Sequence, residues 1–422
     1  MRIIIAATPA ADFVEPLLGL ARLFCRYGHE AVILTGPEFV DRVRETGTAF
    51  AALPVEAGVR IPTLNERALP RLDPAANDIS LRLIAALPGQ YHALAALIAA
   101  FQPDCIVTDQ MFLGAVPIML SPPANRPFVA ACGMTLLTWP GESARSGDVY
   151  RQPSEGVARF NRPTPARGAR LRSAQLEFDR QLRALGVEPQ GSPLTVAARC
   201  ADIYWQAGLP EFDHASTRLP DHIRHIGLWP ALPTRLELPA WAERLQDGRR
   251  LVLVTPGSGA SDHVRQLLLP TMRALAHRKD LVVIGSTGGQ DLSGTQLPDN
   301  ARIADDLPVQ WILPHTHALV TSDEYGATLR ALACGVPTVI AGSDGAHPTV
   351  ATAVARAGAG IDLRTPFPSQ AELRAALDAL LAAGSPQRRA AHAIASRFTR
   401  YDACEIILTG LEEQHQKLCR AA

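Results

Sequence analysis

The sequence Leu319-Val-Thr-Ser-Asp-Glu-Tyr-Gly-Ala-Thr328 decides the fold, together with Gly335-Val-Pro-Thr-Val-Ile-Ala-Gly342 and Ser343-Asp-Gly-Ala-His-Pro348, which follow it. It contains an apolar run of strand length, a polar turn and the start of a helix, and the same order is repeated from Gly335 onward. Such alternation of strand and helix is typical of a parallel α/β sheet. The sequence therefore predicts an α/β fold in which both polar turns follow the carboxyl ends of strands.

These polar turns are expected at the edge where open α/β sheets bind their ligands. A helix that starts at this edge presents free N–H groups and the positive end of its dipole, which favour a phosphate. The first turn, however, carries Asp323 and Glu324 next to each other. Two carboxylates beside a diphosphate would repel it. The turn therefore predicts either an unusual ligand or an altered phosphate site.

Length and composition indicate a globular protein with two cores. A chain of 422 residues is too long for one ordinary core, and its 47% apolar and 19% charged residues can fill two. The 41 basic residues balance the 41 acidic ones, so neither nucleic acid nor an anionic membrane is an expected partner. Apolar runs such as residues 3–7 have the length of strands rather than of membrane spans.

The N-terminus and the cysteines favour a cytoplasmic location. Met1-Arg2 leads directly into a strand, without the regions of a signal peptide. Seven scattered cysteines with no Cys-x-x-Cys are expected to be reduced and buried. We therefore expect no disulfide framework and no cysteine metal site.

The first part of the chain predicts a β-α-β unit, with strands at residues 2–8 and 31–35 and a helix at 14–27 after a turn over 9–13. The turn lacks the Gly-x-Gly-x-x-Gly sequence of dinucleotide sites. A helix over 91–101 leads into another strand, and Asp109 stands at the end of that strand. Asp109 is placed for chemistry at the ligand edge, or it caps the next helix.

The second half predicts another α/β series, with strands at 250–255, 281–286, 319–321 and 338–341. The small turn at Gly257 and Ser258 can bring backbone N–H groups close to a phosphate. Three prolines within residues 227–239, Pro230, Pro233 and Pro239, predict a linker. The expected division is an N-terminal domain over 1–226, the linker over 227–239, a C-terminal domain over 240–400 and a final helix over 401–422 that packs back on the first domain.

The order of short motifs resembles that of the inverting, nucleotide-sugar-dependent glycosyltransferases of natural products, family 1 of the GT-B fold. The motifs that carry the resemblance run through nearly the whole chain: Thr8-Pro9, Val14-x-Pro16, Gly28-His29, Leu34-Thr35-Gly36, Thr108-Asp109-x-Met111-Phe112, Leu313-Pro314-His315, Gly335-Val336-Pro337 and Gly358-Ala359-Gly360. The resemblance implies two Rossmann-like domains that face each other across a cleft, with the acceptor on the first domain and a UDP- or TDP-sugar mainly on the second.

The functional residues of this family match the chain only in part. The family's base, a histidine that pairs with an aspartate at the position of Asp109, corresponds to Phe13, which cannot accept a proton. Asp12 stands one residue before it. Among the residues expected at the family's donor site, Gly257 and Ser258 match its first nucleotide-side turn. Its glycine-rich phosphate turn corresponds to residues 322–326, where Ser322, Tyr325 and Gly326 flank the two carboxylates and only the last glycine is kept.

Several residues keep two interpretations. Asp323 and Glu324 are either solvated carboxylates at a helix start or groups that meet a cation, hydroxyl or proton. His347, which stands where the family has a sugar-binding residue, is either a surface histidine or the missing base. Phe112, Met134 and Trp139, with Phe13 and Tyr325, are candidates for the substrate pocket, although lone apolar residues are more often core.

Three functions remain open at this point. The first is a glycosyltransferase that tailors a small apolar metabolite, with Asp109 and Asp12 or His347 assisting deprotonation. The second is an enzyme that performs elimination, rearrangement or cyclisation in the same cleft without a nucleotide sugar. The third is a non-catalytic binding or auxiliary protein. The expected partner is a small molecule, a homodimer is left open, and no metal site is predicted.

Overall fold

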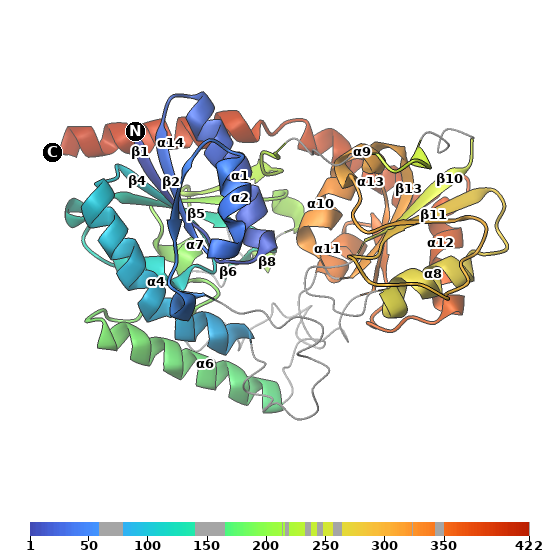
Figure 1. Cartoon of the computed structure of the whole chain (residues 1–422), viewed down its shortest axis with the longest axis horizontal. Helices are drawn as coiled ribbons and strands as arrows, with labels where there is room; N and C mark the ends of the chain where they lie inside the picture. The colour runs from blue at the N-terminus through green and yellow to red at the C-terminus, as the bar shows by residue number, and fades with distance from the viewer. Residues whose placement is uncertain are drawn as a thin grey trace. The chain divides into compact units, whose positions relative to one another are not determined.

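The computed structural model describes residues 1–58, 79–139, 165–212, 214–215, 219–232, 238–242, 248–255, 264–322, 324–341 and 350–421. Within these ranges the chain forms two compact units (Figure 1). The first comprises Met1–Gly208, Asp213–Leu232 and Tyr401–Ala422, and the second comprises Leu209–Phe212 and Pro233–Arg400. Both units are α/β, as predicted.

The first unit is built on a seven-stranded sheet with the order β3-β2-β1-β4-β5-β7-β9, and its neighbouring strands all pair in parallel. The strands are β1 (Arg2–Ala6), β2 (Glu30–Thr35), β3 (Ala49–Ala52), β4 (Cys105–Asp109), β5 (Phe128–Gly133), β7 (Ile203–Ala207) and β9 (Ile223–Gly227); β6 (Thr138–Trp139) and β8 (His214–Ala215) form a separate pair. The helices are α1 (Ala11–Arg26), α2 (Val40–Arg44), α4 (Ile79–Phe101), α5 (Val116–Met119), α6 (Pro165–Ala184), α7 (Val196–Cys200) and α14 (Ala403–Ala421).

The second unit has a six-stranded parallel sheet with the order β12-β11-β10-β13-β14-β15. Its strands are β10 (Arg250–Thr255), β11 (Leu281–Ser286), β12 (Ala301–Ala304), β13 (Thr316–Ser322), β14 (Thr338–Ala341) and β15 (Gly360–Asp362). Its helices are α8 (Leu269–Ala274), α9 (Val309–Ile312), α10 (Tyr325–Ala333), α11 (Val350–Arg356), α12 (Gln370–Leu381) and α13 (Pro386–Phe398), with a π-helical turn at Val264–Leu268.

Both sheets are buried on two faces, which explains the unbroken apolar runs of their central strands. In β1, Ile3 and Ile5 belong to the core on one face, whereas Ile4 belongs to the core on the other. In β10, Val252 and Leu253 divide between two cores in the same way. Side chains alternate across a strand, so one apolar run supplies both layers.

Two helices begin earlier than their sequence patterns predict. Helix α1 starts at Ala11, because the N–H of Val14 already donates to the carbonyl of Ala10 at 2.9 Å; Asp12 and Phe13 therefore lie in its first turn, and the turn expected over 9–13 is shorter. Helix α4 starts at Ile79 and runs through Pro88. Buried packing of its first half outweighs the break that proline normally causes.

Helix α4 also contains an apolar stretch that the sequence analysis did not single out. Leu81–Phe101 has 21 residues and a mean hydropathy of 1.5, so its length and composition would allow it to cross a membrane. Ile84, Leu87 and Leu94 are fully buried in the first unit. A core helix has the same length and composition, so this stretch is weak evidence for a membrane span.

The last helix, α14, packs on the first unit (Figure 1). Ile407 and Leu411 are fully buried in the core that contains β1 and β7. A Cβ on Gly410 would lie 2.8 Å from a methyl carbon of Ile203, so glycine allows the helix to approach the sheet closely. Thus residues from both ends of the chain share one core.

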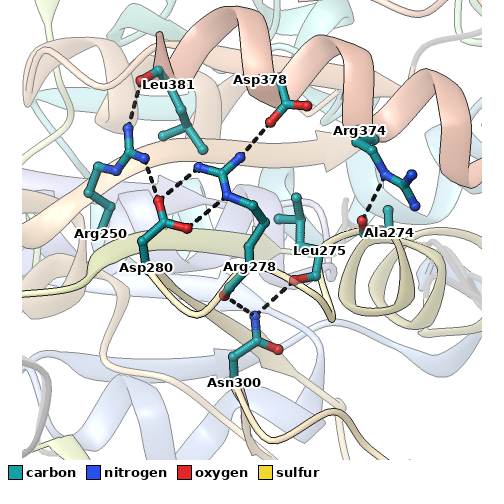
Figure 2. Close-up of polar contacts among 9 residues, drawn as sticks. All are labelled: Arg250, Ala274, Leu275, Arg278, Asp280, Asn300, Arg374, Asp378 and Leu381. Atoms are coloured by element: carbon teal, nitrogen blue, oxygen red, sulfur yellow. Dashed lines mark hydrogen bonds and ion pairs between the residues drawn. The ribbon is translucent and has the colours of Figure 1, made fainter. Parts of the chain in front are cut away.

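An ion-pair network fastens α12 to the amino ends of β10 and β11 in the second unit (Figure 2). Arg278 donates to Asp280 at 2.7 Å and to Asp378 of α12 at 2.6 Å. Arg250 donates to Asp280 at 2.5 Å and to the carbonyl of Leu381 at 2.7 Å. Hydrogen bonds from the two arginines lower the pKa of Asp280 well below its usual range. In this network both terminal nitrogens of Arg250 donate to an acceptor.

Candidate functional site

Asp109, the last residue of β4, lies at the carboxyl edge of the first sheet and is only 1% exposed. One carboxylate oxygen accepts the backbone N–H of Thr8 at 2.6 Å, and the other accepts the Thr8 hydroxyl at 2.9 Å and the Met111 N–H at 2.8 Å. Thr8 follows β1, the neighbouring strand. Asp109 therefore links the ends of two adjacent strands, in addition to holding the turn that follows its own strand.

Two opposing effects set the charge of Asp109. Burial raises its pKa, while the hydrogen bonds from Thr8, Met111 and Phe112 lower it, and the balance raises the pKa from 3.8 to about 6. Desolvation disfavours the carboxylate, but donors on both oxygens stabilise it. At pH 7 Asp109 is therefore mainly ionised, which agrees with three donors directed at it.

Asp12 and Phe13 follow closely after Thr8, the hydrogen-bond partner of Asp109, and the two side chains differ in exposure. Thr8 is followed by a short turn to α1, and Asp12 is an exposed residue in the first turn of that helix. The partly buried ring of Phe13 packs against the core formed by β1 and α1. Of the two candidates, Asp12 is the one that presents a proton acceptor to solvent.

The apolar candidates of the first unit are largely buried. Phe112, Met134 and Trp139 are 1%, 8% and 7% exposed, and all three belong to core clusters. Their contact with a substrate stays a prediction, because the structure leaves little of their surface for one. Next to the Asp109 turn, a small apolar pocket is lined by Leu83, Met111, Leu113, Leu171, Ala174, Pro193 and Leu194.

On the second unit, Glu324 occupies the start of α10. Both oxygens of its carboxylate accept the N–H of Ala327, at 3.0 and 2.9 Å, so Glu324 is the N-cap of the helix. A Cβ on Gly326 would lie 3.0 Å from Glu324 Oε1, and glycine thereby leaves room for the carboxylate. Ser322 ends β13 just before this turn, and Tyr325 is buried at 6% exposure. The chain's own carboxylate thus satisfies an N–H group that a phosphate would otherwise accept from.

Four sequence-predicted site residues, Asp323, His347, Gly257 and Ser258, lie outside the described residues. Their roles stay predictions. Among the residues that are described, no group of three or more His, Cys, Asp or Glu side chains could hold a metal ion.

Sequence reasoning missed Thr8 as the partner of Asp109. The two residues are 101 positions apart, so only the strand pairing reveals their contact. The signal was present in the motif Thr8-Pro9, since a hydroxyl at the end of one strand can meet a carboxylate at the end of its neighbour.

The chain is similar along most of its length to known glycosyltransferases. 4'-Demethylrebeccamycin synthase of Lentzea aerocolonigenes is 30% identical over 415 residues, which cover 90% of this chain and 91% of that protein. UDP-glucosyltransferase A1 of Starmerella bombicola is 26% identical over 427 residues, covering 97% of this chain and 92% of that protein. Residues 270–408 match the C-terminal domain of the family described as erythromycin biosynthesis protein CIII-like.

A solved structure agrees on the fold. The calicheamicin glycosyltransferase CalG4 superposes with a TM-score of 0.70 at 20% identity, and the match covers 100% of this chain and 99% of that one. The two parallel sheets with their helices are therefore those of the GT-B fold. Together with the 30% identity to the rebeccamycin enzyme over nine-tenths of both proteins, this places the chain in the GT-B family 1 of natural-product glycosyltransferases.

Proposed function

We propose that this enzyme transfers a sugar from a UDP- or TDP-sugar to a hydroxyl group of a small apolar metabolite. Its named relatives support the class of reaction, since they include UDP-glucosyltransferases and a rebeccamycin synthase. The observation that carries the proposal is the pair of hydrogen bonds from Thr8 to the Asp109 carboxylate, at the ligand edge of the first sheet. An ionisable group held in a buried network at this edge is typical of a functional site.

In the proposed reaction the exposed carboxylate of Asp12 is the base. It accepts the proton of the acceptor hydroxyl while the acceptor oxygen forms a bond to the anomeric carbon of the donor. The bond from that carbon to the phosphate oxygen breaks, and its electrons leave with the nucleoside diphosphate. General-base assistance of this kind contributes about 10² to 10⁴ in rate.

Asp109 is a positioning residue in this mechanism. It is 1% exposed and its oxygens are occupied by Thr8 and Met111, so a substrate hydroxyl has little access to it. Instead it fixes the end of β1 and thereby the turn that leads to the first turn of α1, where Asp12 lies. Removing its charge should therefore lower turnover through a misplaced Asp12.

The donor side is proposed to bind nucleoside diphosphate weakly. Glu324 already satisfies the N–H of Ala327 and carries a negative charge at the helix start. A unit charge about 4 Å from a phosphate charge costs about 4 kcal/mol at an effective dielectric constant near 20, roughly a thousandfold in affinity. The donor must displace Glu324 or place its phosphates away from the start of α10.

A second candidate function follows from the same observation. If Glu324 keeps its capping position throughout the reaction and no donor phosphate binds away from the start of α10, the protein performs acid/base chemistry on the metabolite without a nucleotide sugar. Phe13 at the place of the family's base also favours this reading, because a phenyl ring cannot accept a proton.

Mass spectrometry of acceptor mixtures with several UDP- and TDP-sugars tests the first proposal. The expected product is an acceptor carrying one added sugar, and its formation should fall in an Asp12→Asn variant but persist in Asp41→Asn, a change at an exposed carboxylate of α2. A metabolite that changes in mass or in chromatographic retention without any donor sugar would support the second candidate instead.

A further inference from the structure

A second recess lies in the second unit, at the amino ends of its strands. A pocket of about 530 Å³ is lined by residues that precede or begin β10, β13 and β14, and by α13. We call it the rear pocket and define it by Arg249, His315, His317, Arg388, His392 and Cys334. Ligands of open α/β sheets bind at the carboxyl ends of strands, so the rear pocket is separate from the proposed donor site around Glu324.

The lining of the rear pocket is basic. Among the described residues that line it are two arginines and three histidines, and none of these lining residues is acidic. Gly335, with φ of +72°, lies against His392: a Cβ there would come within 2.6 Å of His392 Nδ1. Glycine at this position therefore allows a histidine of α13 to sit at the pocket wall.

Arg388 is only partly matched by hydrogen-bond acceptors. Its Nη2 donates to the carbonyl of His317 at 3.4 Å, but its Nε is buried and no described residue accepts its hydrogen. Burial and the charge of Arg250 lower the pKa of Arg388. A buried donor without an acceptor costs about 1 to 3 kcal/mol. The Nε–H of Arg388 is thus a donor without an acceptor among the described residues.

The neighbouring Arg250, unlike Arg388, donates to a carboxylate and to a backbone carbonyl. Figure 2 shows its guanidinium between Asp280 and the carbonyl of Leu381. Asp280 also receives hydrogen bonds from Arg278. That carboxylate is consequently used by the network of β10, β11 and α12, and it does not line the rear pocket.

His317 adds a hydrogen-bond donor, because one hydrogen bond fixes the tautomer of its ring. Its Nδ1 accepts the backbone N–H of Leu251 at 3.2 Å, so in the neutral ring the proton is on Nε2. His317 therefore lines the rear pocket with a ring whose remaining nitrogen donates. Together with Arg388 it offers hydrogen-bond donors, and no acidic side chain is among the described residues that line the rear pocket.

We propose that the rear pocket binds a phosphate-type dianion, either free phosphate or the phosphate group of a small metabolite. The guanidinium of Arg388 supplies a planar fork that fits oxyanions, and His317 supplies a further N–H. The N-terminus of α13 takes no part, because Ser385 already caps it through the N–H of Arg388. The volume of about 530 Å³ leaves room for an organic group beside the phosphate.

Isothermal titration calorimetry with inorganic phosphate, in a buffer free of other oxyanions, tests the proposal on the full chain. Arg388→Gln should weaken binding about ten- to a hundredfold, since a hydrogen bond to a charged group contributes about 1.5 to 3 kcal/mol. Arg388→Lys, which keeps the charge and loses the fork, should fall between the parent and Arg388→Gln. His317→Asn keeps an acceptor for the Leu251 N–H and should also weaken binding.

Arg389→Gln is the matched control. It removes the same charge from the next residue of α13, whose side chain donates to the carbonyl of Gly384 and does not line the rear pocket. A second titration with glucose 6-phosphate separates the two sources of the anion: tighter binding of the ester points to a metabolite, and equal binding to free phosphate. No binding of either probe, or equal losses in Arg388→Gln and Arg389→Gln, would overturn the proposal.

Discussion

Replacing Asp109 by asparagine should change how the stability of the first unit depends on pH. The pKa of Asp109 rises from 3.8 to about 6 on folding. Between these values the unfolded chain is deprotonated while the folded protein keeps the proton, so the free energy of unfolding falls as pH rises from about 4 to about 6. At 1.36 kcal/mol per pKa unit, the fall is about 3 kcal/mol. Above about pH 7 this contribution is constant.

An asparagine side chain has nearly the same shape as aspartate, but its amide does not titrate. It also leaves one donor of Thr8 or Met111 without an acceptor, which subtracts a roughly constant amount of about 1 to 3 kcal/mol. The stability of Asp109→Asn relative to the parent should therefore improve by about 2 to 3 kcal/mol between pH 4 and pH 7, whatever its offset. The difference curve isolates this group, because the other titrating residues are common to both proteins.

Urea unfolding at a series of pH values, read by hydrogen exchange at peptides from β1 and β4, measures this difference in the first unit alone. Asp41→Asn, which removes a carboxylate that is 86% exposed, is the control. A flat difference curve between pH 4 and pH 7 would refute the argument that burial outweighs the hydrogen bonds of Asp109. A difference curve that falls with pH would show that the hydrogen bonds lower the pKa of Asp109 by more than burial raises it.

Three further predictions address the base, the donor site and the fold. Asp12→Asn should lower kcat by about 10² to 10⁴ in steady-state assays and leave the fold intact, because its side chain is exposed; an unchanged kcat would exclude it as the base. Glu324→Gln should strengthen binding of UDP, measured by calorimetry, since it removes the negative charge at the start of α10, whereas equal affinities would mean that the phosphates bind elsewhere. Leu411→Ala should destabilise the first unit by about 2 to 5 kcal/mol in urea unfolding, because the side chain is fully buried in its core; a loss below 1 kcal/mol would contradict that packing.

The fold was largely predictable because its central strands are apolar runs bounded by turns. Residues 281–286 and 338–341 form β11 and β14 with the predicted limits. The start of α4 was not predictable, since Pro88 interrupts the local pattern and only tertiary packing carries the helix through it. Local sequence thus defined the sheet better than it defined the helix ends.

The candidate site was predictable only where local sequence determines it. The position of Asp109 at the end of β4 followed from the strand pattern, whereas its bond to Thr8 depends on strand pairing across 101 residues. Glu324 had two interpretations, and the structure shows the capping contact that belongs to the helix start. A charge pattern alone cannot distinguish these, because both place a carboxylate in the first turn of a helix.

The most direct test of sugar transfer is mass spectrometry of the parent protein incubated with UDP- and TDP-sugars and a panel of small apolar acceptors that carry a hydroxyl group. The account predicts an acceptor with one added sugar, formed together with free nucleoside diphosphate, and much less of it with Asp12→Asn. Acceptors that remain free of sugar with every donor, while the folded protein converts one of them in the absence of donor, would contradict it.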